Sequence, residues 1–191
     1  DGTNNTALGI SAGYRINKGD DSTFIGYKAG YQTTGSDNTF VGSEAGYGGT
    51  TSVPYSSGQQ NVAVGYQALK GFTTGHSNVV VGNQAGYNIN SGHELTIMGY
   101  QAGYNVTTAD NSTIIGWKAG YNITTARYNV LIGDQAGYNL RTHSVNSDNV
   151  MIGNNAGEAG DDTWPQATDN VYVGRSAGKN LDDGYGNVIL G

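Results

Sequence analysis

Short runs of apolar and Thr residues recur along the chain, and most runs lie between an Asn and a Gly, as in Asn78-Val79-Val80-Val81-Gly82. Runs this short and this rich in β-branched residues favour strands over helices. No apolar spacing of i, i+3, i+4 and i+7 is sustained along the chain. The pattern therefore predicts many short strands and almost no helix.

One unit repeats from end to end: three apolar or Thr residues, an anchor Gly, two variable residues, Ala, usually Gly and often Tyr. The anchor glycines are mostly 17 residues apart, and they are Gly9, Gly26, Gly42, Gly65, Gly82, Gly99, Gly116, Gly133, Gly153, Gly174 and Gly191. A short repeat of strands and turns predicts one coil of a solenoid per unit. We expect an all-β fold: a parallel β-solenoid (β-roll) of about eleven 17-residue coils, forming a single domain over residues 1–191. At ~4.8 Å per coil the rod would be roughly 50 Å long.

The rest of each unit predicts turns, a second strand and loops. A segment such as Gln84-Ala85-Gly86-Tyr87 suggests a second, smaller strand in each coil. The anchor Gly either has a positive φ at a corner or allows close approach of two coils, and its constant place favours the corner. The Ala three residues later predicts a thin core. Insertions follow the Ala-Gly step, so we expect loops at 48–60, 139–148 and 158–169.

Both faces of every predicted strand are apolar. Neighbouring residues of a strand point to opposite sides, yet neither of the two positions before the anchor Gly carries a charge. A strand that is apolar on both sides needs burial on both sides, and a 17-residue coil is too small to provide it. We therefore predict self-association of three-fold or two-fold symmetry through the column two residues before the anchor Gly. This column, the predicted oligomer interface, includes Phe24, Phe40, Val80, Ile97, Ile114, Leu131, Met151, Tyr172 and Ile189. The alternative is that this column faces inward and the Thr/Val columns lie on a flattened, partly wet surface.

Composition narrows the classes of function. Gly accounts for 32 of 191 residues, charged residues for 13%, and the net charge is -6. The acidic balance argues against nucleic acid, and no apolar stretch is long enough for membrane insertion. Cys is absent, which excludes disulfides and thiolate zinc sites. Without a nucleophile motif, we expect no enzyme activity, no cofactor and no metal. The composition is typical of a fibre or a surface protein.

The inserted loops provide the best candidates for receptor contact, because insertions in solenoids often form the binding edge. They present Tyr55, His143 and Trp164. A Tyr column either packs coil on coil, the favoured interpretation, or binds sugars. His76 and His93 lie 17 residues apart, which leaves a shared metal as a weaker alternative. The acidic pairs, favoured as solvated turns over calcium ligands, are Asp20-Asp21, Asp161-Asp162 and Asp182-Asp183.

The repeat resembles a known family. Two segments carry the resemblance, Asn61-Val62-Ala63-Val64-Gly65-Tyr66-Gln67-Ala68 and Asn78-Val79-Val80-Val81-Gly82-Asn83-Gln84-Ala85-Gly86. They are similar to the YadA-like head repeat of trimeric autotransporter adhesins and to repeats of trimeric phage tail fibres. The resemblance implies a left-handed roll, a homotrimer about one axis and an extracellular adhesive role. The chain departs from the family in its longer coils, in the Gly-Tyr after Ala, and in lacking a heptad stalk and a membrane-anchoring barrel segment.

These observations predict a structural and adhesive segment of an extracellular trimeric fibre, on a cell surface or a virion. Its partners would be its own copies and a host-surface glycan or protein. One alternative is the receptor-binding shaft of a phage tail fibre. Another is an ice-binding solenoid that uses Thr rows such as Thr107-Thr108 and Thr124-Thr125. Because the chain starts and stops within the repeat, we expect a fragment of a longer fibre or the subunit of a head-to-tail filament.

Overall fold

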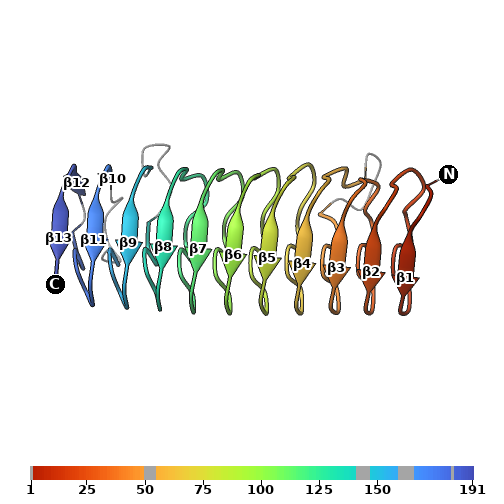
Figure 1. The fold of residues 1–191 in the computed structure, drawn as a ribbon, viewed down its shortest axis with the longest axis horizontal. Helices are drawn as coiled ribbons and strands as arrows, with labels where there is room; N and C mark the ends of the chain where they lie inside the picture. Colours follow the sequence, from red (N-terminus) through yellow and green to blue (C-terminus); the bar gives the residue numbers. More distant parts are fainter. Residues whose placement is uncertain (1, 50–54, 141–146, 159–165, 182) are drawn as a thin grey trace.

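The chain winds into a parallel β-solenoid, as the repeat predicts. A computed structural model describes residues 2–49, 55–140, 147–158, 166–181 and 183–191, and these contain strands and turns but no helix. About ten turns stack into a straight rod with the N- and C-termini at opposite ends (Figure 1). None of the described residues forms a helix that could cross a membrane.

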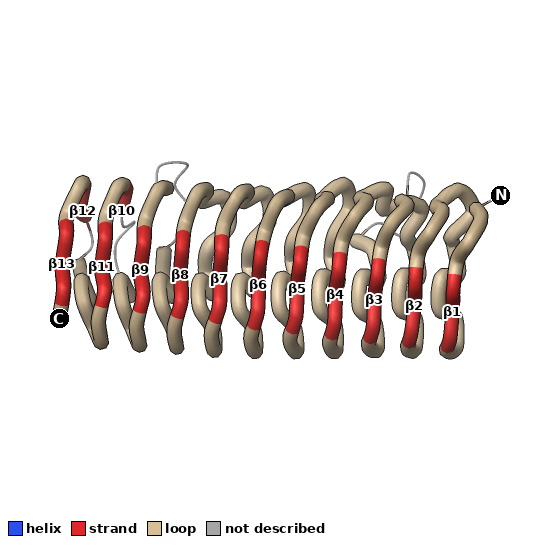
Figure 2. The backbone as a smooth tube through the Cα atoms, viewed as in Figure 1, coloured by secondary structure: helices blue, strands red, loops and turns tan. Residues whose placement is uncertain are grey.

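Each coil contributes one three-residue strand to a single parallel sheet, seen as one row of strands in Figure 2. The strands pair in register, so that Thr113 lies beside Val130 and Ile114 beside Leu131. The eleven strands are β1 (Thr6–Leu8), β2 (Thr23–Ile25), β3 (Thr39–Val41), β4 (Val62–Val64), β5 (Val79–Val81), β6 (Thr96–Met98), β7 (Thr113–Ile115), β8 (Val130–Ile132), β9 (Val150–Ile152), β11 (Val171–Val173) and β13 (Val188–Leu190). A second sheet pairs β10 (Gln166–Thr168) with β12 (Asp183–Tyr185).

The middle residue of each strand points into the core, which corrects the predicted oligomer interface. Phe24, Phe40, Val80, Ile97, Ile114, Leu131 and Met151 are completely buried within one chain, Tyr172 is buried, and Ile189 packs partly buried against the same core. Side chains without exposed surface cannot contact a second copy. The alternative, an inward column with the Thr/Val column outside, is the arrangement found. The core needs these larger residues because the invariant Ala column beside them is small.

The Gly of the Ala-Gly step makes room for this inward column. A Cβ at Gly30 would lie 2.4 Å from the ring of Phe24, and one at Gly46 would lie 2.3 Å from the ring of Phe40. In the coil of β4 the Gly is replaced by Leu69, and the inward residue is Ala63, with both side chains fully buried. Here the large residue stands at the Gly position and the small residue at the inward strand position, so the core of this coil remains densely packed.

The anchor Gly serves both purposes that the sequence left open. Gly116 has φ of 137°, a backbone conformation that side-chain-bearing residues rarely adopt. A Cβ at Gly116 would also lie 2.2 Å from the carbonyl oxygen of Gly133 in the next coil. The corner prediction is confirmed, and the close approach of coils accompanies it.

The second, smaller strand predicted at residues 84–87 is wrong. Gln84 and Gly86 have φ values near +53°, so the segment forms turns rather than an extended strand. Hydrogen bonds between coils persist here, because Gly86 N donates to Ala102 O at 2.9 Å. Left-handed residues let the chain reverse sharply while its amides still point along the rod.

A buried Asn ladder explains the polar residue that begins most units. Asn78 Nδ2 donates to Asn61 Oδ1 at 3.0 Å and to Gly92 O at 2.9 Å, and Asn78 Oδ1 accepts from Leu95 N at 3.1 Å. Buried polar groups need such partners. The ladder therefore ties the start of one strand to the coils on either side.

Candidate functional surfaces of the rod

The outward side of the eleven-stranded sheet is uncharged along its whole length. The first and third residues of every strand form it, and we call this surface the outer face. It consists of Thr6, Thr23, Thr39, Val62, Val79, Thr96, Thr113, Val130, Val150, Val171, Val188, Leu8, Ile25, Val41, Val64, Val81, Met98, Ile115, Ile132, Ile152, Val173 and Leu190. Inner coils expose it substantially, with Val64 at 37% and Met98 at 41%. Each strand is thus apolar on both sides, as the sequence showed, but the exposed column is the one next to the anchor Gly.

Exposed aromatic side chains follow the anchor Gly at the corner beside the outer face. Tyr66, Tyr100 and Trp117 are each close to half exposed. The rings of Tyr100 and Trp117 lie nearly parallel with centroids 6.5 Å apart, and Lys118 Nζ lies 4.6 Å from the Trp117 centroid. This corner combines apolar area with few charges, a composition that suits a protein contact.

The Tyr column forms two stacks. The first consists of Tyr14, Tyr31 and Tyr47, and the second of Tyr87, Tyr104, Tyr121 and Tyr138. Tyr87, Tyr104 and Tyr121 stack with centroids 5.0 and 5.2 Å apart and nearly parallel planes. Each inner ring covers its neighbour's face, so these faces cannot stack on a sugar. This geometry agrees with the favoured coil-packing interpretation.

Lys70 occupies the gap between the two Tyr stacks. Its Nζ lies 5.8 Å from the Tyr47 ring and 5.5 Å from the Tyr87 ring, and 2.8 Å from Glu44 Oε2. The hydrogen bond from Lys70, followed by that from Gln67, holds the pKa of Glu44 below its usual value. A cation thus bridges the break in the aromatic ladder.

The three predicted receptor contacts are only partly placed. Tyr55 is half-buried, and the Arg15 guanidinium carbon lies 5.1 Å from its ring centroid. His143 and Trp164 lie outside the described residues. The structure therefore does not bring the three together or separate them.

The two His residues stack as neighbours in adjacent coils. Their ring centroids are 4.7 Å apart, and His93 Nδ1 lies 2.9 Å from Asp110 Oδ1. Arg127 Nε lies 3.2 Å from the other oxygen of Asp110. Within the described ranges, no three His, Cys, Asp or Glu side chains are grouped so that they could hold a metal ion. His93 and Arg127 thus both contact the carboxylate of Asp110, and His76 stacks on His93.

The acidic pair at the first turn also bonds between coils. Asp20 Oδ1 accepts from Thr3 N at 2.6 Å, and Asp21 Oδ1 accepts from Asn4 Nδ2 at 2.9 Å. The backbone hydrogen bond from Thr3 is the main cause that lowers the pKa of Asp20. Both carboxylates therefore act as turn acceptors. Asp161, Asp162 and Asp182 lie outside the described residues.

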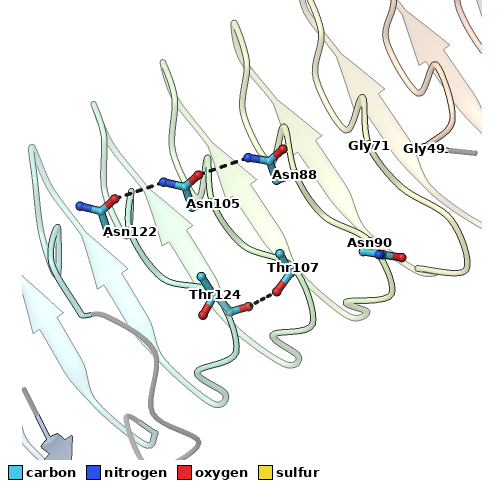
Figure 3. A pocket seen from close by; sticks show the side chains of 8 residues that line it. All are labelled: Gly49, Gly71, Asn88, Asn90, Asn105, Thr107, Asn122 and Thr124. Carbon is cyan, nitrogen blue, oxygen red and sulfur yellow. Dashed lines mark hydrogen bonds between the residues drawn. The ribbon is translucent and has the colours of Figure 1, made fainter. Parts of the chain in front are cut away.

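A longitudinal groove, which we call the amide groove, has a volume of about 560 Å³ and runs along several coils (Figure 3). It is lined by Gly49, Gly71, Asn88, Asn90, Asn105, Thr107, Asn122 and Thr124. One wall is an Asn row and the other a row of Asn90, Thr107 and Thr124, as Figure 3 shows. All eight residues are uncharged.

Hydrogen bonds fix the orientation of both walls. Asn88 Nδ2 donates to Asn105 Oδ1 at 3.2 Å, and Asn105 Nδ2 donates to Asn122 Oδ1 at 3.1 Å. On the opposite wall, Thr107 Oγ1 donates to Thr124 O at 3.1 Å. The Thr rows of the ice-binding hypothesis are thus used partly within the rod.

Sequence reasoning did not identify this groove. Its signal was present as an Asn after four successive residues of the Tyr column, at 17-residue spacing: Asn88, Asn105, Asn122 and Asn139. That signal is weak in a chain where Asn also begins most strands. Only the turn geometry separates the half-buried Asn88, Asn105 and Asn122 of the groove from the fully buried Asn ladder.

Comparison of the chain with protein-family models, with curated proteins and with solved structures finds no match.

Proposed function

We propose that this chain is a non-catalytic structural rod of an extracellular fibre, in which three copies associate through the outer face. The observation that supports the proposal is the absence of any charged residue among the 22 positions of that face. An uncharged strip that runs along a whole rod is larger than the apolar patches that monomers usually expose. Association with sibling chains would remove it from water.

The size of the outer face suits a stable contact. Eleven strands at ~4.8 Å spacing extend for ~50 Å, and three-residue strands with their flanking side chains are ~15 Å wide. The product is ~750 Å², close to the ~800 Å² that each partner buries in a standard interface. The aromatic corner of Tyr66, Tyr100 and Trp117 adds residue types that are enriched at interfaces.

The interior of the rod suits mechanical spacing. Fully buried side chains, the Asn ladder and hydrogen bonds between coils repeat along its length, as at Gly116 N to Met98 O, 2.8 Å. In such a solenoid each coil is stabilised mainly by its two neighbours. The adhesive part of the proposal rests on the inserted loops, with Tyr55, His143 and Trp164 as receptor contacts for a host-surface glycan or protein.

Mass in solution tests the association. Light scattering should give about three times 19.9 kDa for the unaltered chain. The double variant Val64→Lys/Met98→Lys should give the mass of one chain, because it places two charges in the centre of the outer face. Both positions are exposed, and the Lys stems can lie on the sheet, so circular dichroism should show an unchanged fold.

The control is Gln59→Lys/Thr74→Lys, which adds the same charge at exposed positions away from the sheet. It should keep the mass of the unaltered chain. A single-chain mass for the unaltered protein at micromolar concentration would overturn the proposal, and so would a Val64→Lys/Met98→Lys variant that stays trimeric.

A further inference from the structure

We propose that the amide groove binds a neutral polysaccharide strand that lies along the rod axis. The groove is formed by residues 105–107 and 122–124 and their equivalents, whereas the outer face of the same coils is formed by residues 96–98 and 113–115. The two surfaces use different parts of each coil. Binding in the groove is therefore independent of association through the outer face.

The chemistry of the lining selects the ligand class. Its side chains are carboxamides and hydroxyls, and Gly49 and Gly71 add backbone only. A charged polymer would lose hydration here without meeting an opposite charge, which is unfavourable. A sugar hydroxyl both donates and accepts, and so does a carboxamide or a Thr hydroxyl. A neutral, hydroxyl-rich polymer is the class that matches every side chain of the groove.

The Asn row has hydrogen-bonding capacity beyond the ladder. Asn105 donates one N–H to Asn122 and accepts one bond from Asn88. A carboxamide has two N–H groups and two lone pairs on its oxygen, so one of each remains for a ligand. Because the ladder orients these amides in advance, binding costs little side-chain entropy. Figure 3 shows the amides aligned along one edge of the groove.

The opposite wall contains a hydroxyl that lacks a partner. Thr124 Oγ1 is buried and forms no hydrogen bond. An unpaired buried hydroxyl is destabilising in the free rod. Rotation about χ1 would turn this hydroxyl toward a ligand hydroxyl and let it form a hydrogen bond. Ligand binding would therefore remove the destabilisation.

The geometry favours a polymer over a single sugar. The groove extends over the five coils that carry Gly49, Gly71, Asn88, Asn105 and Asn122, which at ~4.8 Å per coil corresponds to ~20 Å. A pyranose unit in an extended chain has about the length of one strand spacing, so successive sugars would meet successive coils. At one end Gly49 and Gly71 line the groove with backbone atoms alone.

Titration calorimetry on the full chain tests the proposal, with cellopentaose and mannohexaose as neutral probes and a galacturonic acid hexamer as the charged probe. At least one neutral probe should bind at millimolar concentration or below, and more tightly than the charged one. The double variant Asn105→Ala/Asn122→Ala should weaken that binding about ten- to hundredfold. The control Asn83→Ala alters an exposed Asn that does not line the groove and should leave binding unchanged.

Side-chain amide resonances in NMR spectra of the unaltered chain keep the proposal falsifiable if the double variant misfolds. The signals of Asn88, Asn105 and Asn122 should shift on addition of the neutral probe. The proposal is overturned if neither neutral probe binds, if the charged hexamer binds more tightly, or if the shifts occur elsewhere. Light scattering of Asn105→Ala/Asn122→Ala should still give the trimer mass, which separates failure here from failure of the association.

Discussion

Replacement of one anchor glycine tests the stacking of the coils most directly. Gly116 lies in the middle of the rod, immediately after β7, and has φ of 137°. In Gly116→Ala the new Cβ would lie 2.2 Å from the carbonyl oxygen and 2.6 Å from the carbonyl carbon of Gly133. Neither a strained backbone nor a contact this short can persist, so the two coils must separate locally.

Two terms contribute to the cost. A residue with a side chain in this region of φ costs about 1–3 kcal/mol. Separation of these two coils weakens the hydrogen bonds between them, such as Gly133 N to Ile115 O at 2.8 Å and Gln135 N to Trp117 O at 2.9 Å. Each such bond contributes about 0.5–1.5 kcal/mol. The sum is about 2–6 kcal/mol, concentrated on the coils of β7 and β8.

Hydrogen exchange is the appropriate assay, because a solenoid opens locally and one unfolding free energy does not describe it. Amides of β7 and β8 should exchange at least ~30-fold faster in Gly116→Ala, the factor that ~2 kcal/mol represents. Amides of β2 and β3 should be unaffected.

Gly186→Ala is the matched control. Gly186 also has a positive φ, 64°, but nothing lies within 4 Å of a Cβ built there. Its replacement should cost only the ~1–2 kcal/mol of a left-handed residue. If Gly116→Ala accelerates exchange no more than Gly186→Ala does, the close approach of coils does not constrain the stack and the reasoning is wrong.

Two further predictions concern the interior and the edge of the Tyr stacks. In hydrogen exchange of the β4 amides, Leu69→Gly should lower the local stability by about 2–4 kcal/mol and Ala63→Val by about 1–3 kcal/mol. The double variant should cost at least ~1 kcal/mol less than the sum of the two, because the two side chains fill one space; additive costs would contradict this. The pKa of Glu44 is lowered by Lys70, so its contribution is present above the ordinary glutamate pKa and is lost as the pH falls through the lowered value. Glu44→Gln should therefore lower Tm at neutral pH, because it removes a contribution to stability of about 1 kcal/mol or less. At pH values below that range the substitution should leave Tm unchanged; an equal loss of Tm at both pH values would contradict the assignment.

Local pattern was sufficient for the architecture. Runs such as Thr113-Ile114-Ile115, each followed by Gly, predicted short strands without helix, and the structure has them. Their 17-residue spacing predicted parallel pairing in register, as found between β7 and β8. These features could be predicted because strand preference and the positive φ of Gly depend on neighbouring residues only.

Neighbouring residues in the sequence could not predict which side of each strand faces the core. Alternation shows that Ile114 and Ile115 point to opposite sides, but both are Ile, and hydrophobicity cannot rank them. The choice depends on where the chain turns after Gly116, which brings the Gly of the Ala-Gly step onto the middle residue of the strand. The error at Phe24 and its column follows from this.

The amide groove depends on the same turns. Asn78 and Asn105 are identical in type, yet Asn78 is buried in the ladder and Asn105 lines the groove. Residue type and spacing specify which side chains recur at each level of the rod. The backbone path around one coil places each of them inside or outside, because contacts between segments distant in sequence set that path, and these contacts form only when the coils stack.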